Sequence, residues 1–124
     1  MIWVSEISLK QLRQTLFDIS KSITENGRSY KGFNLFDELD FTILLAISRG
    51  EFNISGFQNK NLRQTLTNKN SQQVSRILKR LHSHRLIKKI RNSYKYYLTK
   101  LGRAVVTLGI KLKQRYIVPQ LCSL

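Results

Sequence analysis

Residues 71–84 read Ser-Gln-Gln-Val-Ser-Arg-Ile-Leu-Lys-Arg-Leu-His-Ser-His, and this stretch decides the fold that we expect for the chain. Its aliphatic residues are spaced at i, i+3, i+4 and i+7, so they share one face of an α-helix. They are Val74, Ile77, Leu78 and Leu81. The spacing predicts a helix over residues 72–84, capped by Ser71, that packs through this face and exposes a polar and basic one.

The segment after this helix predicts a β-hairpin and then a last helix. Residues 86–90 and 94–98 contain β-branched and aromatic side chains suited to strands, and Arg91-Asn92-Ser93 supplies turn residues between them. Thr99 is a candidate cap for a helix over residues 100–117, which Pro119 would stop.

Further helices are expected on the N-terminal side. A short one covers residues 59–66, and another covers 37–49, capped by Asp37 and stopped by Gly50. The buried stripe of the second is expected to contain Phe36, Leu39, Ile43, Leu44 and Ile47, and Phe52-Asn53-Ile54 suits a short strand. An amphipathic helix over residues 7–25 would end at Asn26-Gly27, followed by an extended or irregular linker to Leu35.

The C-terminal part of the chain carries nearly all of its net charge of +15. Residues 52–124 contain 16 Lys and Arg and no Asp or Glu, whereas residues 1–51 contain six basic and seven acidic residues. A folded surface of one sign repels itself and favours a polyanionic partner, because solvated surfaces normally mix both signs. Nucleic acid is therefore the partner that we expect.

The composition argues against several other classes of function. The single cysteine, Cys122, cannot form an intramolecular disulfide, and with two His it does not give the usual zinc-site spacings. A Mg²⁺-dependent nuclease would need clustered carboxylates, which the basic part lacks, and no phosphate-binding loop or nucleophile motif is present. No signal peptide or membrane-spanning run is visible. We expect a cytoplasmic protein, nucleoid-associated when bound, that is not an enzyme and needs no metal or other cofactor.

The order of elements predicts a mainly α fold with a small β-hairpin (α+β), of the winged helix-turn-helix type, with extra N- and C-terminal helices. The major groove of B-DNA admits one α-helix, so helix 71–84 would read base edges there. The hairpin tip at 91–95 would lie on the backbone or in the minor groove. His82 and His84 are expected at the surface or on phosphates. The expected DNA-binding residues are Asn59, Lys60, Arg63, Ser71, Gln72, Gln73, Ser75, Arg76, Lys79, Arg80, Lys89, Arg91, Asn92, Ser93, Tyr94 and Lys95.

Motifs in this region resemble a known family. The runs Val74-Ser75-Arg76-x-Leu78-x-x-Leu81, Leu86-Ile87-x-Lys89 and Tyr97-Leu98-Thr99-x-x-Gly102 are similar to winged-helix repressors of the multiple-antibiotic-resistance-regulator (MarR) type, over residues 37–102. This resemblance implies a recognition helix at 71–84, a wing at 91–95 and dimerisation through the terminal helices. A looser resemblance, in Arg49-Gly50-Glu51-Phe52 and Gly56-Phe57-x-Asn59-x-x-Leu62-Arg63, is to the C-terminal module of longer uncharacterised bacterial proteins.

The chain is thus expected to have three parts: residues 1–36 for dimerisation or packing, residues 37–102 as the winged-helix domain, and residues 103–124 as a C-terminal helix and tail. A homodimer would form through Leu9, Leu12, Leu16, Ile19 and Ile23. The leading hypothesis is a sequence-selective protein that binds double-stranded DNA and regulates transcription; these residues identify no small-molecule effector. Two alternatives stay open. One is a DNA- or RNA-docking module of a larger replication or mobile-element protein, and the other is an adaptor for an acidic protein.

Overall fold

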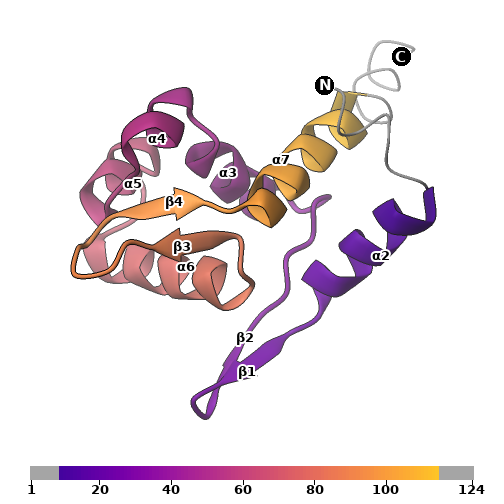
Figure 1. Cartoon of the computed structure of the whole chain (residues 1–124), viewed down its shortest axis with the longest axis horizontal. Coiled ribbons are helices and arrows are strands. Elements are labelled where there is room, and N and C mark those ends of the chain that lie inside the picture. Colours follow the sequence, from indigo (N-terminus) through magenta and orange to yellow (C-terminus); the bar gives the residue numbers. More distant parts are fainter. Residues whose placement is uncertain (1–8, 115–124) are drawn as a thin grey trace.

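The computed structural model describes residues 9–114 of the 124-residue chain. This part is mainly helical with small antiparallel β-hairpins, which confirms the expected α+β class. Its elements (Figure 1) are α2 (Leu9–Ser20), β1 (Ile23–Glu25), β2 (Arg28–Tyr30), α3 (Glu38–Ile47), α4 (Gly50–Ser55), α5 (Asn59–Thr65), α6 (Ser71–Ser83), β3 (Ile87–Lys89), β4 (Tyr96–Leu98) and α7 (Lys100–Leu112).

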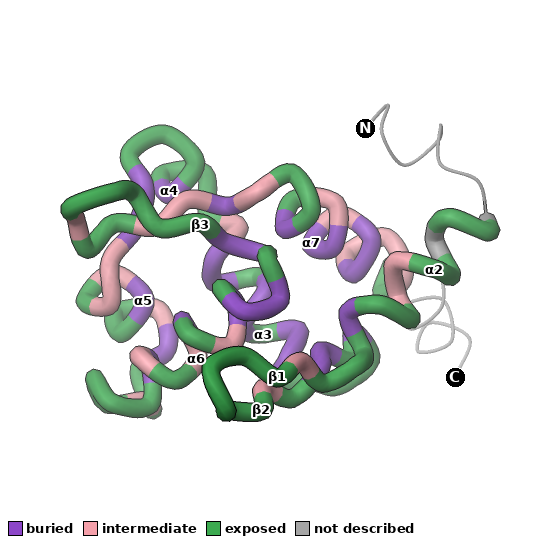
Figure 2. Tube along the Cα trace, turned by 60° about the horizontal axis from the view of Figure 1, so that its bottom comes forward, coloured by how far each residue is buried: buried purple, intermediate pink, exposed green. Residues whose placement is uncertain are grey.

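The core lies where α3, α5, α6 and α7 meet, and Figure 2 shows buried segments in each of these helices. Burying one large aliphatic side chain stabilises a fold by about 1.5–3 kcal/mol, so this cluster fixes how the helices are placed. The side chains most completely removed from solvent include Leu44 and Ile47 of α3, Leu62 of α5, Val74 and Leu81 of α6, and Val105 of α7.

Helix α6 confirms the helix expected from residues 71–84, with one change at its start. Val74, Leu78 and Leu81 are buried, so the predicted face is the one that packs. The N-cap is Asn70, and Ser71 is the first helical residue. Asn70 accepts a hydrogen bond from the Gln73 backbone N–H, and the Gln73 side chain accepts one from the Asn70 N–H, both at 2.9 Å. This reciprocal capping satisfies two backbone donors at the helix start.

Strands β3 and β4 form the expected antiparallel hairpin beside α6. The Ile90 N–H donates to the Lys95 carbonyl at 2.9 Å, which closes the loop between the strands. Phe57, between α4 and α5, forms a single antiparallel bridge with Tyr96 through backbone hydrogen bonds of 3.0 and 2.8 Å. The hairpin is therefore tied to the start of α5 as well as to the end of α6.

The Leu98-Thr99-x-x-Gly102 motif joins α7 to the end of α6. The Thr99 hydroxyl lies 2.7 Å from the Arg85 carbonyl and accepts from the Gly102 N–H at 3.0 Å, so Thr99 caps α7 as expected. A Cβ at Gly102 would lie 2.1 Å from the Leu86 carbonyl oxygen. Glycine is therefore required here by the close approach of α7 to the chain leaving α6.

The structure corrects the expected first helix, of which residues 7 and 8 lie outside the described part. Helix α2 ends at Ser20, and the hairpin β1–β2 follows, with Ile23 in a strand. Asn26 and Gly27 form its two-residue turn, with φ of 51° and 77°. A type I′ turn needs positive φ at both central positions, which Asn-Gly adopts readily. This dipeptide therefore reverses the chain into a hairpin rather than capping a helix.

The buried stripe expected for α3 was wrong in its first turn. Asp37 caps this helix as expected, accepting from the Asp40 N–H at 3.0 Å. Phe36 and Leu39, however, are 62% and 65% exposed. The inward position of the first turn belongs to Asp40, which is buried and in register with the buried Ile43, Leu44 and Ile47. With the Asp40 carboxylate facing inward, Phe36 and Leu39 lie on the solvent-exposed side of the first turn.

The strand expected at Phe52-Asn53-Ile54 was also wrong, because these residues lie in α4, which begins at Gly50. Phe52 is buried against Phe57, with ring centroids 5.1 Å apart, whereas Ile54 is 86% exposed. A three-residue apolar run fits a strand or one turn of helix equally well, and the chain uses Phe57 instead for its bridge to the hairpin.

Helix α7 begins as expected and ends at Leu112, with Lys113 as its C-cap. Residues 115–117 of the expected helix, the stop at Pro119 and the thiol of Cys122 lie outside the described residues. No helix within residues 9–114 is long and apolar enough to cross a membrane.

Candidate nucleic-acid interface

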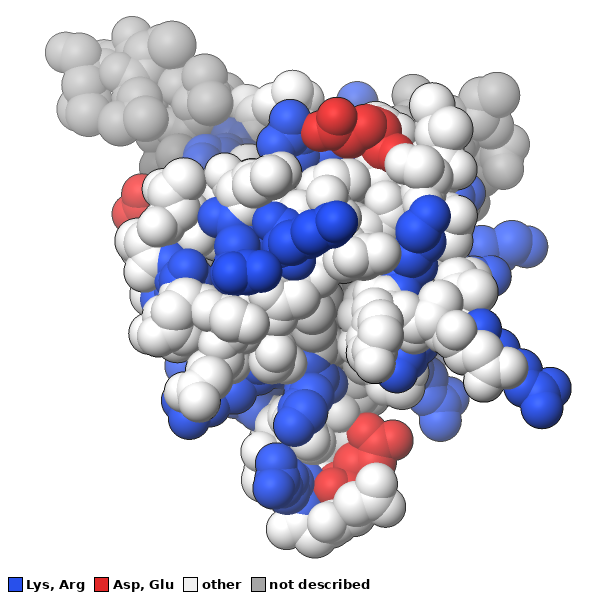
Figure 3. Space-filling model, turned by 90° about the vertical axis from the view of Figure 1, so that its left-hand side faces the viewer, with Lys and Arg blue, Asp and Glu red and all other residues white. Residues whose placement is uncertain are grey.

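The basic side chains of residues 52–114 have almost no acidic partners. Within the described chain, Arg80 is the only one of them that forms an ion pair with a carboxylate. Figure 3 views the end of the molecule that carries α4, α5 and the tip of the β3–β4 hairpin. Lys and Arg side chains spread across this face, and acidic side chains lie toward its margins. This end of the molecule presents the positive surface that the sequence predicted.

The outer face of α6 presents polar and basic side chains to solvent. Gln72, Arg76 and Lys79 are exposed, and their side chains form no hydrogen bond or ion pair within residues 9–114. Gln73 is exposed too, but its side-chain oxygen is used in the capping of α6. Of the residues expected to read bases, Gln72, Arg76 and Lys79 are therefore the ones whose side chains are free to bind a partner.

Asn59 holds α5 against α6. Its side-chain nitrogen donates to the Ser71 carbonyl at 3.1 Å and to the Ser75 hydroxyl at 3.0 Å. Its side-chain oxygen is buried and accepts no hydrogen bond. Asn59 also lines the depression between α5, α6 and the hairpin. Asn59 and Ser75, expected as direct DNA contacts, are half-buried and fix the angle between the two helices.

A depression of about 400 Å³ lies between α5, α6 and the hairpin. No acidic residue lines it, and Leu78 supplies part of its apolar wall. Three basic side chains from two helices meet there: Lys60, Arg63 and Lys79. An anion that enters this space meets positive charge from both helices at once, which suits a phosphate group. The full lining is Gln58, Asn59, Lys60, Arg63, Ser75, Leu78, Lys79, Tyr94 and Tyr96.

The hairpin tip adds further free donors beside this depression. Tyr94 is 81% exposed, and the Lys89 amine lies 5.7 Å from its ring centroid. Ser93 instead shapes the turn, since its hydroxyl donates to the Ile90 carbonyl at 2.9 Å. The other tip residues expected to contact DNA are also exposed, namely Arg91, Asn92 and Lys95.

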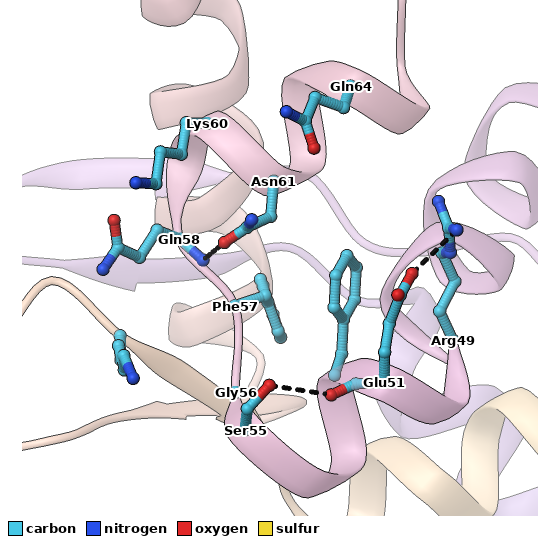
Figure 4. A pocket seen from close by; sticks show the side chains of 11 residues that line it. Arg49, Glu51, Ser55, Gly56, Phe57, Gln58, Lys60, Asn61 and Gln64 are labelled. Carbon is cyan, nitrogen blue, oxygen red and sulfur yellow. Dashed lines mark hydrogen bonds and ion pairs between the residues drawn. The ribbon is translucent and has the colours of Figure 1, made fainter.

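A second hollow of about 460 Å³ adjoins the first and was not expected from the sequence. Figure 4 shows Lys60 and Gln58 on one side of it and the Arg49–Glu51 ion pair on the other. Arg49 also donates to the Thr65 hydroxyl at 3.0 Å, which ties the start of α4 to the end of α5. Because Lys95 lines this hollow too, the hairpin and α5 border both depressions. Gln58 carries no charge or motif that marks it in the sequence.

Arg80, expected to contact DNA, is instead engaged by partners within the protein. Its Nη1 lies 2.9 Å from Asp40 Oδ1, and its Nε donates to the Lys31 carbonyl at 2.9 Å. It also donates to the Gly32 carbonyl, and its guanidinium carbon lies 3.8 Å from the centroid of the Phe33 ring. These contacts hold the segment before α3 against the C-terminal half of α6. The partner that orients Arg80 lies 40 residues away in the chain, so helix periodicity alone could not identify it.

His84 was also placed wrongly, because it is buried rather than at the surface. Its Nε2 lies 2.9 Å from the Lys31 carbonyl, and its ring meets Phe33 edge to face at 5.3 Å between centroids. Burial lowers the pKa of His84 from its usual value of 6.5, as does the nearby Arg80 charge, while hydrogen bonds to the carbonyls of Lys31 and Tyr30 oppose the shift. Neutral imidazole donates through Nε2 to this carbonyl.

The lowered pKa of His84 predicts acid sensitivity of the fold. The unfolded chain binds this proton near pH 6.5, whereas the folded chain binds it only at lower pH. The free energy of unfolding should therefore be retained above pH 6.5 and fall as the pH drops from 6.5 toward the folded pKa. Urea unfolding at several pH values should show a shallower fall for His84→Gln than for the wild type. His82→Gln, at an exposed position on the same helix, is the matched control, and equal slopes for the two variants would contradict the assignment.

The stripe expected to form a homodimer packs in part on its own chain. Ile19 is buried in the core, and Leu16 packs against that core where α2 meets α7. Ile23 is half-buried in β1. The side chains of Leu9 and Leu12 lie outside the described part of the structure. Ile19 is therefore not available to a second copy, because the single chain already covers it, whereas Leu16 is only half-buried.

Comparison of the chain with protein-family models, curated proteins and solved structures found no significant match. The resemblance to MarR-type repressors therefore stays a prediction from the residues. Among residues 9–114, no group of three or more His, Cys, Asp or Glu side chains is placed to hold a metal ion.

Proposed function

We propose that this chain is a sequence-selective double-stranded DNA-binding protein of the winged-helix type that regulates transcription. Helix α6 is the recognition helix, with Gln72 and Arg76 facing base edges, and the β3–β4 hairpin is the wing. The observation that carries the proposal is the convergence of α5, α6 and the hairpin on one acid-free depression at the basic end of the molecule. A duplex backbone seated there would meet Lys60, Arg63 and Lys79.

The different positions of Arg76 and Arg91 favour binding to double-stranded DNA over a general affinity for polyanions. Arg76 projects from the outer face of α6, where an arginine can bind guanine through two hydrogen bonds. Arg91 projects from the hairpin tip, where a contact with phosphate carries no sequence information. Single-stranded DNA or RNA would instead be held by backbone charge and stacking on aromatic rings such as Tyr94.

Arg76→Ala should weaken binding to the selected duplex by about 1–3 kcal/mol and relax the base preference at one position. Arg91→Ala should weaken binding to selected and random duplexes alike. The measurement is selection from random duplexes, followed by titration of both variants with selected duplex, random duplex, single strand and RNA at one salt concentration. Identical behaviour of the two variants on selected and random duplexes would contradict the assignment of α6. Preference for RNA or single strands would contradict the duplex.

A further inference from the structure

The depression between α5, α6 and the hairpin has an aromatic wall as well as basic side chains. Tyr96 lines it, and the Tyr96 ring stacks on Phe57 with centroids 6.0 Å apart. Phe57 in turn lies against Phe52, with ring centroids 5.1 Å apart. The backbone bridge between Phe57 and Tyr96 holds this row of rings in place. Because the Tyr96 ring is already fixed, a further planar group can stack on it with little loss of side-chain freedom.

The residues around Tyr96 match the parts of one nucleotide. Leu78 adds apolar surface, and Lys60, Arg63 and Lys79 bring positive charge from α5 and α6. An unpaired base needs an aromatic surface to stack on, and the phosphate attached to it needs cations within reach. The volume of about 400 Å³ lies within the range of roughly 300–1,000 Å³ that is usual for small-molecule sites. The depression therefore has both the room and the partners for a base with its phosphate.

The second hollow favours a nucleotide that belongs to a strand over a free one. Gln58 and Lys60 line both hollows, so a strand can pass from one to the other along the surface. Lys95 adds a cation on the hairpin side, and Glu51, the acidic residue of this lining, is paired with Arg49 at 2.7 Å. Phosphates on both sides of a bound nucleotide would therefore meet positive charge.

We propose that the depression takes one unpaired nucleotide of the bound DNA, with its base stacked on Tyr96 and its phosphate held by Lys60, Arg63 and Lys79. This inference rests on the proposed DNA-binding function and names a feature of the DNA that base reading by α6 does not require. A duplex in which one nucleotide is already unpaired should be preferred, because a paired base must first be taken out of the stack at a cost in free energy.

The test compares the selected duplex in a fully paired form, with one extra adenine in one strand, and with an abasic residue in place of that adenine. The insertion is moved through successive positions, and dissociation constants are measured at one salt concentration. At the position that fits, the adenine should tighten binding at least about 5-fold over both other forms, because stacking on an aromatic ring contributes this factor or more. The abasic form has the same phosphates and the same break in pairing. Equal affinity for the adenine and abasic forms at every position would overturn the proposal.

Variants of β4 identify the ring that the base contacts. Tyr96→Leu should lose the preference for the extra adenine, and Tyr96→Phe should keep it, because phenylalanine retains the ring. Tyr97→Leu is the matched control, since Tyr97 is the next residue of β4 and does not line either hollow. An unchanged preference in a folded Tyr96→Leu variant would overturn the placement of the base. The comparison of adenine with abasic duplexes needs only the wild type, so it decides the proposal even where Tyr96→Leu does not fold.

Deoxyadenosine monophosphate separates a strand from a free nucleotide, because it carries the same base and phosphate alone. At the concentration of the duplex it should not displace the DNA, and displacement would overturn the assignment to a strand. The duplex titrations also separate this inference from the proposed function. Binding of the paired duplex with no gain from the extra adenine would refute the unpaired nucleotide alone, whereas absence of binding to every duplex would refute the DNA-binding function itself.

Discussion

Asp40→Ala should lower the free energy of unfolding by about 3–5 kcal/mol, because it leaves a buried cation without its counter-ion. Asp40 accepts from Arg80 at 2.9 Å and 3.2 Å through its two oxygens, and from the Asn34 N–H at 3.0 Å. The two side chains are largely shielded from solvent. Alanine removes the carboxylate and leaves the guanidinium with backbone carbonyls alone. Urea unfolding followed by circular dichroism at neutral pH measures the loss.

Glu38→Ala is the matched control for this prediction, because Glu38 lies in the same helical turn but is exposed. Its loss should cost less than about 1 kcal/mol, the range of an exposed charge near a helix N-terminus. Replacing both partners, as Asp40→Leu with Arg80→Met, should recover most of the stability, since an apolar pair leaves no unpaired charge. Equal costs for Asp40→Ala and Glu38→Ala would show that the buried pair does not hold the segment before α3 against α6.

The elements that local spacing determines could be predicted from the sequence. The spacing of Val74, Leu78 and Leu81 predicts the packed face of α6, and Thr99 predicts the start of α7 as its N-cap. The hairpin after α6 follows from its strand-forming residues around a polar turn. In each case the information lies within about two helical turns of sequence, the range over which periodicity and capping act.

The errors arose where distant partners decide the outcome. Arg80 and His84 look like surface residues of a basic helix, and only the return of the chain at Lys31 and Phe33 buries them. Asp40 in turn occupies the inward position of α3 that Leu39 was expected to share. The first hairpin was missed for a different reason, because Asn26-Gly27 is a local signal that also suits a helix end.

The candidate interface was predicted better in its charge than in its geometry. Lys60, Arg63 and Lys79 are exposed as expected, and the fold brings them to one depression. Asn59 and Ser75, from the same helices, join the helices to each other, because a short polar side chain at a helix crossing finds partners within the protein. Charge at a surface position is visible in the sequence, whereas the hydrogen bond that removes a polar residue from the surface is not.

Replacing Lys60, Arg63 and Lys79 together by alanine should reduce duplex affinity by about 100-fold near 0.15 M salt, if each contacts one phosphate. Each neutralised phosphate contributes about −0.9 to the slope of log K against log salt. With six to eight phosphates contacted, the wild-type slope of log K against log salt should be about −5 to −7. The slope of the triple variant should be less negative by about 2.7. Affinity for a random duplex, titrated at several salt concentrations, gives both quantities.

The control removes the same charge from another place. Arg103 and Lys111 lie on α7 and Lys113 is its C-cap, also two lysines and one arginine, and α7 runs away from the hairpin tip and α5 (Figure 1). Their replacement by alanine lowers the net charge equally but should change the slope by much less, because charges beyond a Debye length of about 8 Å from the duplex are largely screened. Equal slopes for the two triple variants would mean that net charge alone drives binding and that the depression between α5, α6 and the hairpin is not where the backbone sits.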